Sequence, residues 1–225
     1  MVAAVALQRE RKSRFVKLFD KTPAGVNCPH FHELVLSNGC PYDCTYCYLR
    51  LTFRGNKAPV LFNNGWEQVK SELDAAPGGV FSTGELADSL AVTPPLLDSA
   101  IDYFAGQTNK YLLLVTKSTN TRVLTQRDPS PQIIVSFSVN STAASALYEP
   151  LCPSREERLL EAAKLRDLGW RVRIRLDPII EEAGIPSQSL LPWAHSANTP
   201  GSITTLGRLL ERVCRDRPMA ECGTQ

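Results

Sequence analysis

The sequence predicts an α/β fold built on a parallel sheet with about five strand–helix units. Short apolar runs alternate along the chain with amphipathic stretches, which is the order that strand–helix–strand crossovers require. Tyr111–Thr116 is a continuous apolar run, typical of a parallel strand that is buried on both faces. The 225 residues are enough for one domain with its own core.

The predicted strands are short apolar runs bounded by polar residues, glycine or proline. In chain order they are His32–Ser37, Val80–Thr83, Tyr111–Thr116, Gln132–Val139 and Arg171–Asp177. Pro178 ends the last run because proline cannot continue a hydrogen-bonded ladder.

The predicted helices alternate with these strands. They are Gly65–Ala75, Pro94–Ala105, Asn120–Gln126 and Ser154–Leu168. Ser154–Leu168 has the strongest signals, because Ser154 is a capping residue, Glu157 completes a capping box and Gly169 ends the helix. Pro94 stands near the first turn of its helix, where a missing N–H costs little.

The two ends of the chain differ from its middle. We expect a basic N-terminal arm over residues 1–25, a catalytic core over 26–182 and an irregular tail over 183–225 with one amphipathic helix at Ile203–Cys214. We interpret the arm as a solvated segment rather than a phosphate-binding one. Its basic residues are Arg9, Arg11, Lys12, Arg14 and Lys17.

The composition is that of an ordinary globular protein, with 43% apolar and 21% charged residues. The net charge of +2 does not by itself imply a nucleic-acid partner. No stretch approaches the roughly 20 apolar residues that a membrane span needs, so we expect no membrane partner. Met1–Gln8 is a poor signal peptide, and seven cysteines, an odd number, suit a reducing cytoplasm.

The most informative motif is a cysteine loop in which Cys40, Cys44 and Cys47 have the spacing Cys-x3-Cys-x2-Cys. Three thiolates on one loop can bind three irons of a four-iron cluster and leave the fourth iron open to chemistry. An electron-transfer cluster normally closes that position with another cysteine. Tyr46 and Tyr48 flank Cys47, where their rings either cover a planar ligand or pack the loop.

The alternative is a zinc site or a closed cluster, which needs a fourth ligand. Cys28, His30 and His32 are candidates for that ligand, because they precede the loop by only a few residues. The other three cysteines stand isolated along the chain: Cys152, Cys214 and Cys222.

The loop resembles the cluster-binding motif of radical S-adenosylmethionine (SAM) enzymes. Further blocks resemble, in the same order, those of the spore photoproduct lyase family: NCPHFHELVLSNGCPYDCTYCYLR, TGELADSLA, LLVTKS, VSFSVNS and YEPLCPSREERLLEAAKLRDLGWRVRIRLDPI. The resemblance covers roughly residues 26–182 and implies a partial parallel (β/α) barrel of the radical SAM type.

By this resemblance, Cys40, Cys44 and Cys47 bind a 4Fe-4S cluster whose open iron is chelated by SAM. An electron then splits SAM to a 5′-deoxyadenosyl radical, which abstracts hydrogen from a substrate. The family also implies a reducing electron donor of flavodoxin or ferredoxin type, and DNA as the default substrate. No residue of the sequence specifies the substrate.

The resemblance also implies a set of cofactor-binding residues: Tyr46, Tyr48, Thr83, Gly84, Lys117 and Ser138. Gly84 would let the backbone approach the SAM amino group closely, and Lys117 would lie near the SAM carboxylate. A solvated lysine at a strand end and a satisfied core hydroxyl are the simpler interpretations of Lys117 and Ser138.

The candidate catalytic residues are Glu85, Arg175 and Asp177. Glu85 stands at or near the place of the cysteine that donates hydrogen in spore photoproduct lyases, and a carboxylate cannot replace a thiol in that step. We therefore expect a paralogue with another substrate. Arg175 and Asp177 project to one side of their strand, and we favour the lumen side because the apolar residues of the other side suit packing under helices.

The sequence also departs from the family in length. The similarity ends at about Ala183, where the family continues with further barrel elements. We expect a truncated, paralogous or inactive member whose barrel is incomplete at its C-terminus.

Overall fold

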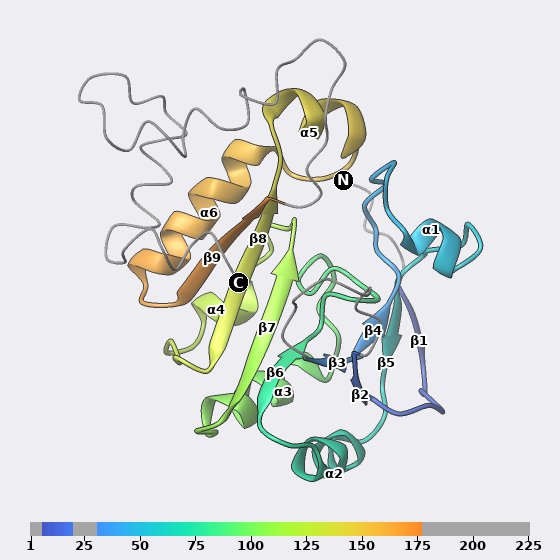
Figure 1. Cartoon of the computed structure of the whole chain (residues 1–225), viewed down its shortest axis with the longest axis vertical. Coiled ribbons are helices and arrows are strands. Elements are labelled where there is room, and N and C mark those ends of the chain that lie inside the picture. The colour runs from blue at the N-terminus through green and yellow to red at the C-terminus, as the bar shows by residue number, and fades with distance from the viewer. Residues whose placement is uncertain (1–5, 20–30, 177–225) are drawn as a thin grey trace, which may run out of the picture.

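A six-stranded sheet forms the centre of the molecule (Figure 1). The computed structural model describes residues 6–19 and 31–176. The strand order is β2-β3-β6-β7-β8-β9. The bounds are β2 Val16–Leu18, β3 His32–Leu34, β6 Gly79–Ser82, β7 Lys110–Thr116, β8 Ile133–Val139 and β9 Arg171–Leu176.

The predicted parallel sheet is confirmed. The strands from β3 to β9 pair in parallel with their neighbours, and only β2 is antiparallel to β3. Within the described residues the sheet is open, with β2 at one edge and β9 at the other, and no closed barrel is formed.

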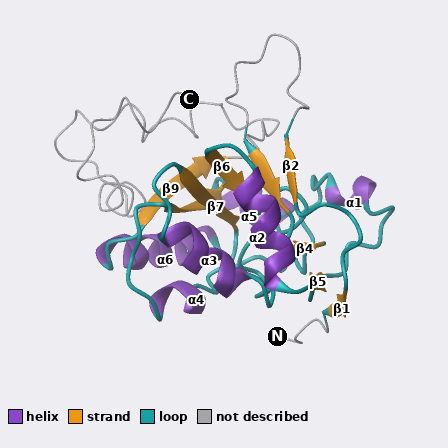
Figure 2. Cartoon of the chain, turned by 90° about the horizontal axis from the view of Figure 1, so that it is seen from below, coloured by secondary structure: helices purple, strands orange, loops and turns teal. Residues whose placement is uncertain are grey.

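The predicted helices are present, with ends that differ by a few residues from the sequence pattern. They are α2 Trp66–Ala75, α3 Leu97–Ala105, α4 Arg122–Thr125 and α6 Arg155–Asp167. Helices α3, α4 and α6 lie along one face of the sheet (Figure 2). The predicted capping box is formed, since the Ser154 hydroxyl accepts from the Glu157 N–H and the Glu157 carboxylate accepts from the Ser154 N–H.

The segment predicted as one strand over His32–Ser37 is divided in two. After β3 the chain leaves the main sheet and forms β4 (Ser37–Asn38), which pairs with β5 (Val60–Phe62). A further strand, β1 (Leu7–Arg9), completes a small sheet in the order β1-β5-β4. Two short helices, α1 (Leu49–Thr52) and α5 (Thr142–Tyr148), were also absent from the sequence prediction.

The expected solvated arm is found at four of its five basic residues and fails at one. Arg11 is buried, whereas the other four are exposed: Arg9, Lys12, Arg14 and Lys17. Phe15 is fully buried, and Arg11 is only 8% exposed, with its guanidinium 5.8 Å and 5.0 Å from the ring centres of Phe15 and Phe62. The Glu72 carboxylate accepts hydrogen bonds from the N–H groups of Phe15 and Val16. Aromatic packing and these buried contacts outweigh the tendency of basic residues to remain in water.

Strand β9 shows the predicted division of its two faces. Val172 and Ile174 pack against the core that includes α6, whereas Arg173 and Arg175 are exposed. The apolar face therefore lies under the helix, as expected, and Arg175 lies on the opposite face. Asp177 lies outside the described residues.

No helix in the described part of the chain combines the length and the apolar character that crossing a bilayer would require. The cytoplasmic location stays a prediction, as do the boundaries of the core and the tail.

Candidate functional site

The cysteine loop begins at a glycine that no other residue can replace without strain. Gly39 has φ +78°, and a Cβ at this position would lie 2.4 Å from the carbonyl oxygen of Ala58. Its N–H donates to the Leu86 carbonyl at 2.8 Å, and the N–H of Cys40 donates to the Lys57 carbonyl at 2.8 Å. The loop therefore leaves β4 in one defined direction.

Two backbone hydrogen bonds attach the loop to the last residue of α5 and to the segment that follows it. The N–H of Asp43 donates to the Pro150 carbonyl at 3.3 Å, and the N–H of Thr45 donates to the Tyr148 carbonyl at 2.9 Å. Helix α5 follows β8 directly, so these bonds place the loop near the carboxyl end of that strand. Ligands of open parallel sheets bind at this end of the strands.

A buried carboxylate, Glu149, connects the loop with the ends of β7 and β8. Its Oε1 accepts from the Tyr46 hydroxyl of the loop and from Asn140 Nδ2 at 2.7 Å. Its Oε2 lies 2.6 Å from an Arg158 nitrogen, and both of these side chains are 0% exposed. Lys117 Nζ lies 3.9 Å from Oε1. Glu149 thus joins residues that are distant in the sequence.

The Arg158 guanidinium, which neutralises Glu149, has further hydrogen-bond partners. It donates to the carbonyls of Pro153 at 2.8 Å and Ser138 at 3.0 Å, besides Glu149. Burial alone would raise the pKa of Glu149, but the Tyr46 hydrogen bond and the charges of Arg158 and Lys117 outweigh it and hold that pKa below its usual value. Glu149 is therefore ionised at neutral pH.

The loop thiols have different environments. The pKa of Cys44 is lowered to about 7, first by the hydrogen bond that its sulfur shares with Cys152 and then by the charge of Lys117. Burial, followed by the charge of Asp88, raises the pKa of Cys40 to about 12. A Cys40 thiolate therefore needs a compensating positive charge, which a metal centre supplies.

Cys152 was regarded as isolated from its position in the sequence, and the structure corrects this view. Its Sγ lies 3.5 Å from the Sγ of Cys44, and the hydrogen bond to Cys44 raises the pKa of Cys152. The β8–α6 connection carries Cys152 to the loop, and no periodicity in the sequence signals this approach.

The donor chemistry of the loop fits an iron–sulfur cluster. Soft thiolates select iron–sulfur clusters, zinc or copper(I). In the described part of the chain no three histidine, cysteine or acidic side chains converge on one point. Cys28 and His30 lie outside the described residues, and His32 stacks on Phe81 at 4.7 Å.

The segment after β6 is fixed by its own contacts. The Thr83 hydroxyl donates to Ser89 Oγ at 2.7 Å, and Ser82 Oγ donates to a Glu85 carboxylate oxygen at 3.2 Å. A Cβ at Gly84 would lie 2.5 Å from Cβ of Val115 in β7. Packing between the strands therefore already requires glycine at this position, whether or not a cofactor binds there.

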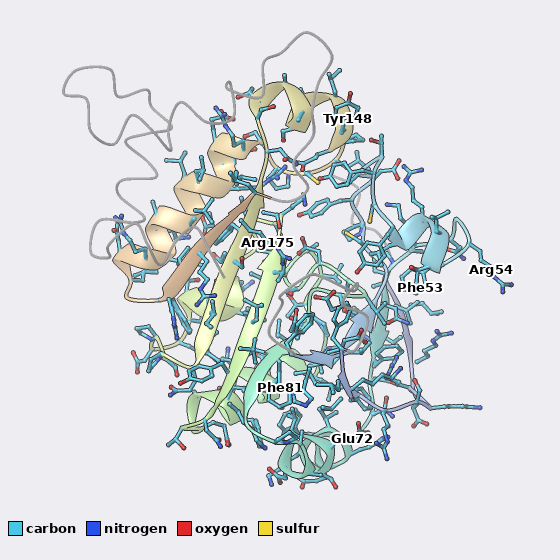
Figure 3. The ribbon with its side chains drawn as sticks, viewed as in Figure 1. Phe53, Arg54, Glu72, Phe81, Tyr148 and Arg175 are labelled. Atoms are coloured by element: carbon cyan, nitrogen blue, oxygen red, sulfur yellow. The ribbon has the colours of Figure 1, made fainter. Side chains whose placement is uncertain are left out.

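The remaining predicted site residues lie around the carboxyl ends of the strands. Lys117 Nζ is 5.6 Å from the Tyr46 ring centre and its side chain is 15% exposed, so it is not a solvated lysine. Ser138 is buried near the end of β8 and pairs in register with Arg175. Arg175 is labelled in Figure 3. The Ser138 carbonyl is engaged by Arg158, as described above.

Tyr48 brings two catalytic candidates into one region. Its hydroxyl donates to the Glu85 carbonyl. Partial burial, then the charges of Glu85 and Cys47, raise the pKa of Tyr48, while the positive charge of Arg175 opposes them. Glu85 and Arg175 therefore both lie close enough to Tyr48 of the loop to influence it electrostatically, and their catalytic role stays a prediction.

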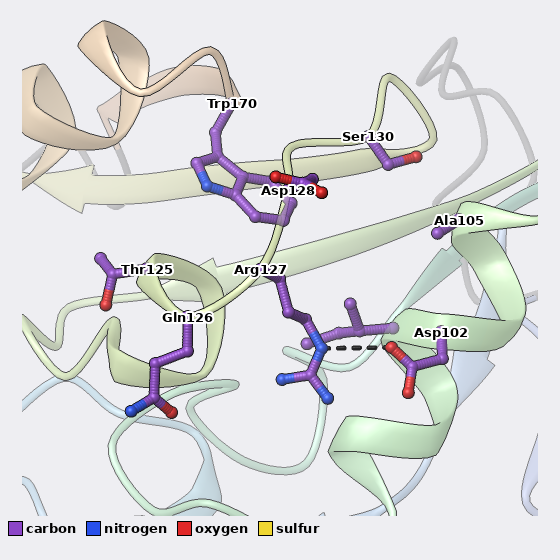
Figure 4. A pocket seen from close by; sticks show the side chains of 9 residues that line it. Asp102, Ala105, Thr125, Gln126, Arg127, Asp128, Ser130 and Trp170 are labelled. Carbon is purple, nitrogen blue, oxygen red and sulfur yellow. Dashed lines mark hydrogen bonds and ion pairs between the residues drawn. The ribbon is translucent and has the colours of Figure 1, made fainter.

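A second concave region lies away from the cysteine loop. A pocket of about 570 Å³ opens between α3, α4 and the loops that precede β8 and β9 (Figure 4). Arg127 lies in it and donates from Nε to Asp102 at 3.1 Å. Trp170 lines the pocket, and its buried indole N–H has no hydrogen-bond partner among the described residues. None of the predicted site residues line this pocket.

These features define an α/β protein with a thiol-rich site at the carboxyl end of a parallel sheet. Comparison with known proteins finds spore photoproduct lyases as its relatives. The spore photoproduct lyase of Clostridium acetobutylicum is 25% identical over 156 residues, which are 66% of this chain and 46% of the relative. The chain thus spans about half the length of this curated relative. No family model matches the chain.

Solved structures give the same relationship at the level of the fold. A spore photoproduct lyase complexed with dinucleoside spore photoproduct has a TM-score of 0.68 at 19% identity, covering 93% of this chain and 66% of that one. A mutant of spore photoproduct lyase with bound AdoMet and dinucleoside spore photoproduct has a TM-score of 0.62 at 22% identity, covering 67% and 46%. The resemblance found in the sequence is confirmed.

Proposed function

We propose that this chain is a radical SAM enzyme of the spore photoproduct lyase type. In this proposal Cys40, Cys44 and Cys47 bind a 4Fe-4S cluster, and an electron from a flavodoxin- or ferredoxin-like donor enters there. The observation that carries the proposal is the three-thiol loop, fixed by backbone hydrogen bonds beside the carboxyl end of β8. The low-identity relationship to spore photoproduct lyase supports it.

The cluster, when bound, would supply the electron that cleaves SAM to methionine and a 5′-deoxyadenosyl radical. The protein would supply orientation. Lys117 is a suitable partner for the SAM carboxylate, because Glu149 and the Tyr46 ring hold its ammonium group beside the loop. The segment after β6, at Thr83 and Gly84, would offer backbone groups to the SAM amino group. Ser138, near the end of β8, would lie further inside the proposed site.

The substrate side of the proposed site would include Glu85, Arg175 and Tyr48. Glu85 carries no hydrogen atom that a carbon radical can abstract readily, so we propose a reaction other than the thiol-dependent repair of spore photoproduct. DNA remains the substrate class that the relatives suggest, since three of their solved structures hold dinucleoside spore photoproduct. Asp177 stays a candidate on sequence grounds alone.

Anaerobic reconstitution with iron and sulfide tests the cofactor chemistry. We expect a reduced cluster whose electron paramagnetic resonance signal changes on adding SAM, with slow formation of 5′-deoxyadenosine under dithionite. Cys44→Ala should lose both, whereas Cys222→Ser, a matched change outside the loop, should keep both. One equivalent of retained zinc with no response to SAM would refute the proposal and support the non-catalytic metal module.

The substrate class is tested separately with DNA. Ultraviolet-irradiated DNA, added to the loaded enzyme, should increase the rate of 5′-deoxyadenosine formation over that with unirradiated DNA. Equal rates with both would exclude a photolesion as the substrate and leave the cluster chemistry intact.

A further inference from the structure

Two cysteine sulfurs that are 108 residues apart in the sequence lie within 3.5 Å of each other, Cys44 in the loop and Cys152 after α5. A disulfide bond is about 2.05 Å long, so the sulfurs need to approach by about 1.5 Å to bond. Rotation about the Cα–Cβ bonds of the two cysteines can move their sulfurs by such a distance. The structure describes four free cysteines, Cys40, Cys44, Cys47 and Cys152, and these two are in hydrogen-bonding contact.

The approach is set by contacts on both sides of the pair. The hydrogen bonds from Asp43 to Pro150 and from Thr45 to Tyr148 bracket Cys44 on both sides. The segment that carries Cys152 is held in turn by the buried Glu149, through its pair with Arg158. The two sulfurs therefore stay together whenever the loop is folded against this segment.

We propose that Cys44 and Cys152 are a site of reversible disulfide formation when the loop carries no cluster. The oxidant is a small-molecule disulfide, such as oxidised glutathione. The Cys44 thiolate attacks one sulfur of glutathione disulfide, forms a mixed disulfide and releases one glutathione thiolate. Cys152 then loses its proton, attacks the Cys44 sulfur and releases the second glutathione. The protein thiols lose two electrons and two protons in total, and glutathione disulfide is reduced to two thiols.

The disulfide and the cluster exclude each other, because Cys44 cannot bond to Cys152 and to iron at the same time. This consequence rests on the proposed function, whereas the disulfide itself does not. In the oxidised form the disulfide would hold the loop against α5 and the β8–α6 connection. Cys44, the middle one of the three proposed ligands, would then be protected. Reduction by a dithiol would return Cys44 to the loop.

Thiol mapping of the full-length, cluster-free chain tests the disulfide. The chain is treated anaerobically with oxidised glutathione, alkylated, digested and analysed by mass spectrometry. We expect peptides containing Cys44 and Cys152 joined by a bond that dithiothreitol cleaves, with a loss of about 2 Da for the intact protein. Bonding of Cys44 to Cys40 or Cys47, or glutathione adducts on Cys44 alone, would overturn the proposal.

Variants separate this pair from general thiol oxidation. Cys152→Ser should abolish the linked peptide and leave Cys44 glutathionylated, whereas Cys222→Ser should retain the linkage. If Cys152→Ser does not fold, as judged by circular dichroism, the mapping of the unsubstituted chain decides alone. A linkage that persists in denaturant-unfolded chain to the same extent would show random pairing and refute the proposal.

Iron loading measures the consequence for the cluster. Oxidised chain should take up at least about tenfold less iron than reduced chain, and dithiothreitol should restore uptake. The Cys152→Ser variant should take up the same amount of iron before and after treatment with glutathione disulfide, once a monothiol has removed the glutathione from Cys44. If the linked peptide is found but even the reduced chain binds no iron, the disulfide stands and the proposed function fails.

Discussion

Two arginines, each paired with carboxylates, differ in their access to water. Arg158 and Glu149, beside the cysteine loop, are both 0% exposed at 2.6 Å. Arg127, in the pocket near Trp170, reaches Asp98 at 2.6 Å and Asp102 at 3.1 Å, but these carboxylates are 53% and 67% exposed. The ion-pair distances are similar, so the difference in solvent decides what each pair contributes. The buried ion pair beside the loop is shielded from water, whereas water can replace the carboxylate partners of Arg127 at the pocket.

The largest effect is expected from removing the buried carboxylate. Glu149→Ala should lower the free energy of unfolding by about 3–5 kcal/mol, because it leaves the Arg158 guanidinium buried and uncompensated. Chemical denaturation followed by circular dichroism measures it, with Glu156→Ala in the first turn of α6 as an exposed control. A fall in the free energy of unfolding of less than about 1 kcal/mol would mean that the buried pair of Arg158 contributes no more than the exposed pairs of Arg127.

The pH dependence of stability sharpens the same point. The folded-state pKa of Glu149 is below its usual value, so its contribution is present above the unfolded pKa of about 4.3 and is lost as pH falls through the folded pKa. The stability difference between the unsubstituted chain and Glu149→Gln should therefore be constant near neutrality and shrink below about pH 4. A difference that grows on acidification would contradict the assignment of an ionised Glu149.

An intermediate effect is expected at Lys117. Lys117→Met keeps the apolar stem but removes the charge that lies 3.9 Å from Glu149 and 5.6 Å from the Tyr46 ring centre. The free energy of unfolding should fall by about 1 kcal/mol, since Arg158 still neutralises the carboxylate. Under the proposed function the same variant should also weaken SAM binding to loaded enzyme, measured by the SAM-dependent change in the cluster spectrum.

The smallest effect is expected at the pocket. Asp102→Asn should change the free energy of unfolding by less than about 1 kcal/mol, because Arg127 keeps Asp98 and water screens the pair. Repeating the denaturation at high salt should reduce even this difference. A larger, salt-independent loss would mean that the pocket holds its charges as rigidly as the loop does.

The long elements of the fold were predictable from the sequence because each has a strong local signal. The capping box of α6, the apolar run of β7 and the alternation in β9 all appear where the patterns place them. The short helices α1 and α5 were missed whereas α4, which is as short as α1, was predicted, because four to seven residues carry too little periodicity to be recognised consistently. The burial of Arg11 was missed because its partners, Phe15 and Phe62, are brought together only by the fold.

The sequence was sufficient to name candidate ligands for the site but not the residues that surround them. The spacing of the cysteines was sufficient to single out Cys40, Cys44 and Cys47, whose ligand role stays a prediction. Nothing local marks Glu149 or Cys152 as a neighbour of that loop, because both contacts span about a hundred residues and depend on how β8 and α6 cross the sheet. The only sequence signal was their position in a block that resembles the relatives.

Gly84 bears on how the ancestry of this chain is read. Its missing side chain makes room for Val115, so replacement by alanine is resisted by interstrand packing alone. A descendant that had lost every catalytic property would still retain glycine there for as long as it folded. A glycine kept at this position during evolution is therefore evidence of folding alone. Retained catalysis has to be inferred from residues that the packing of the sheet does not require.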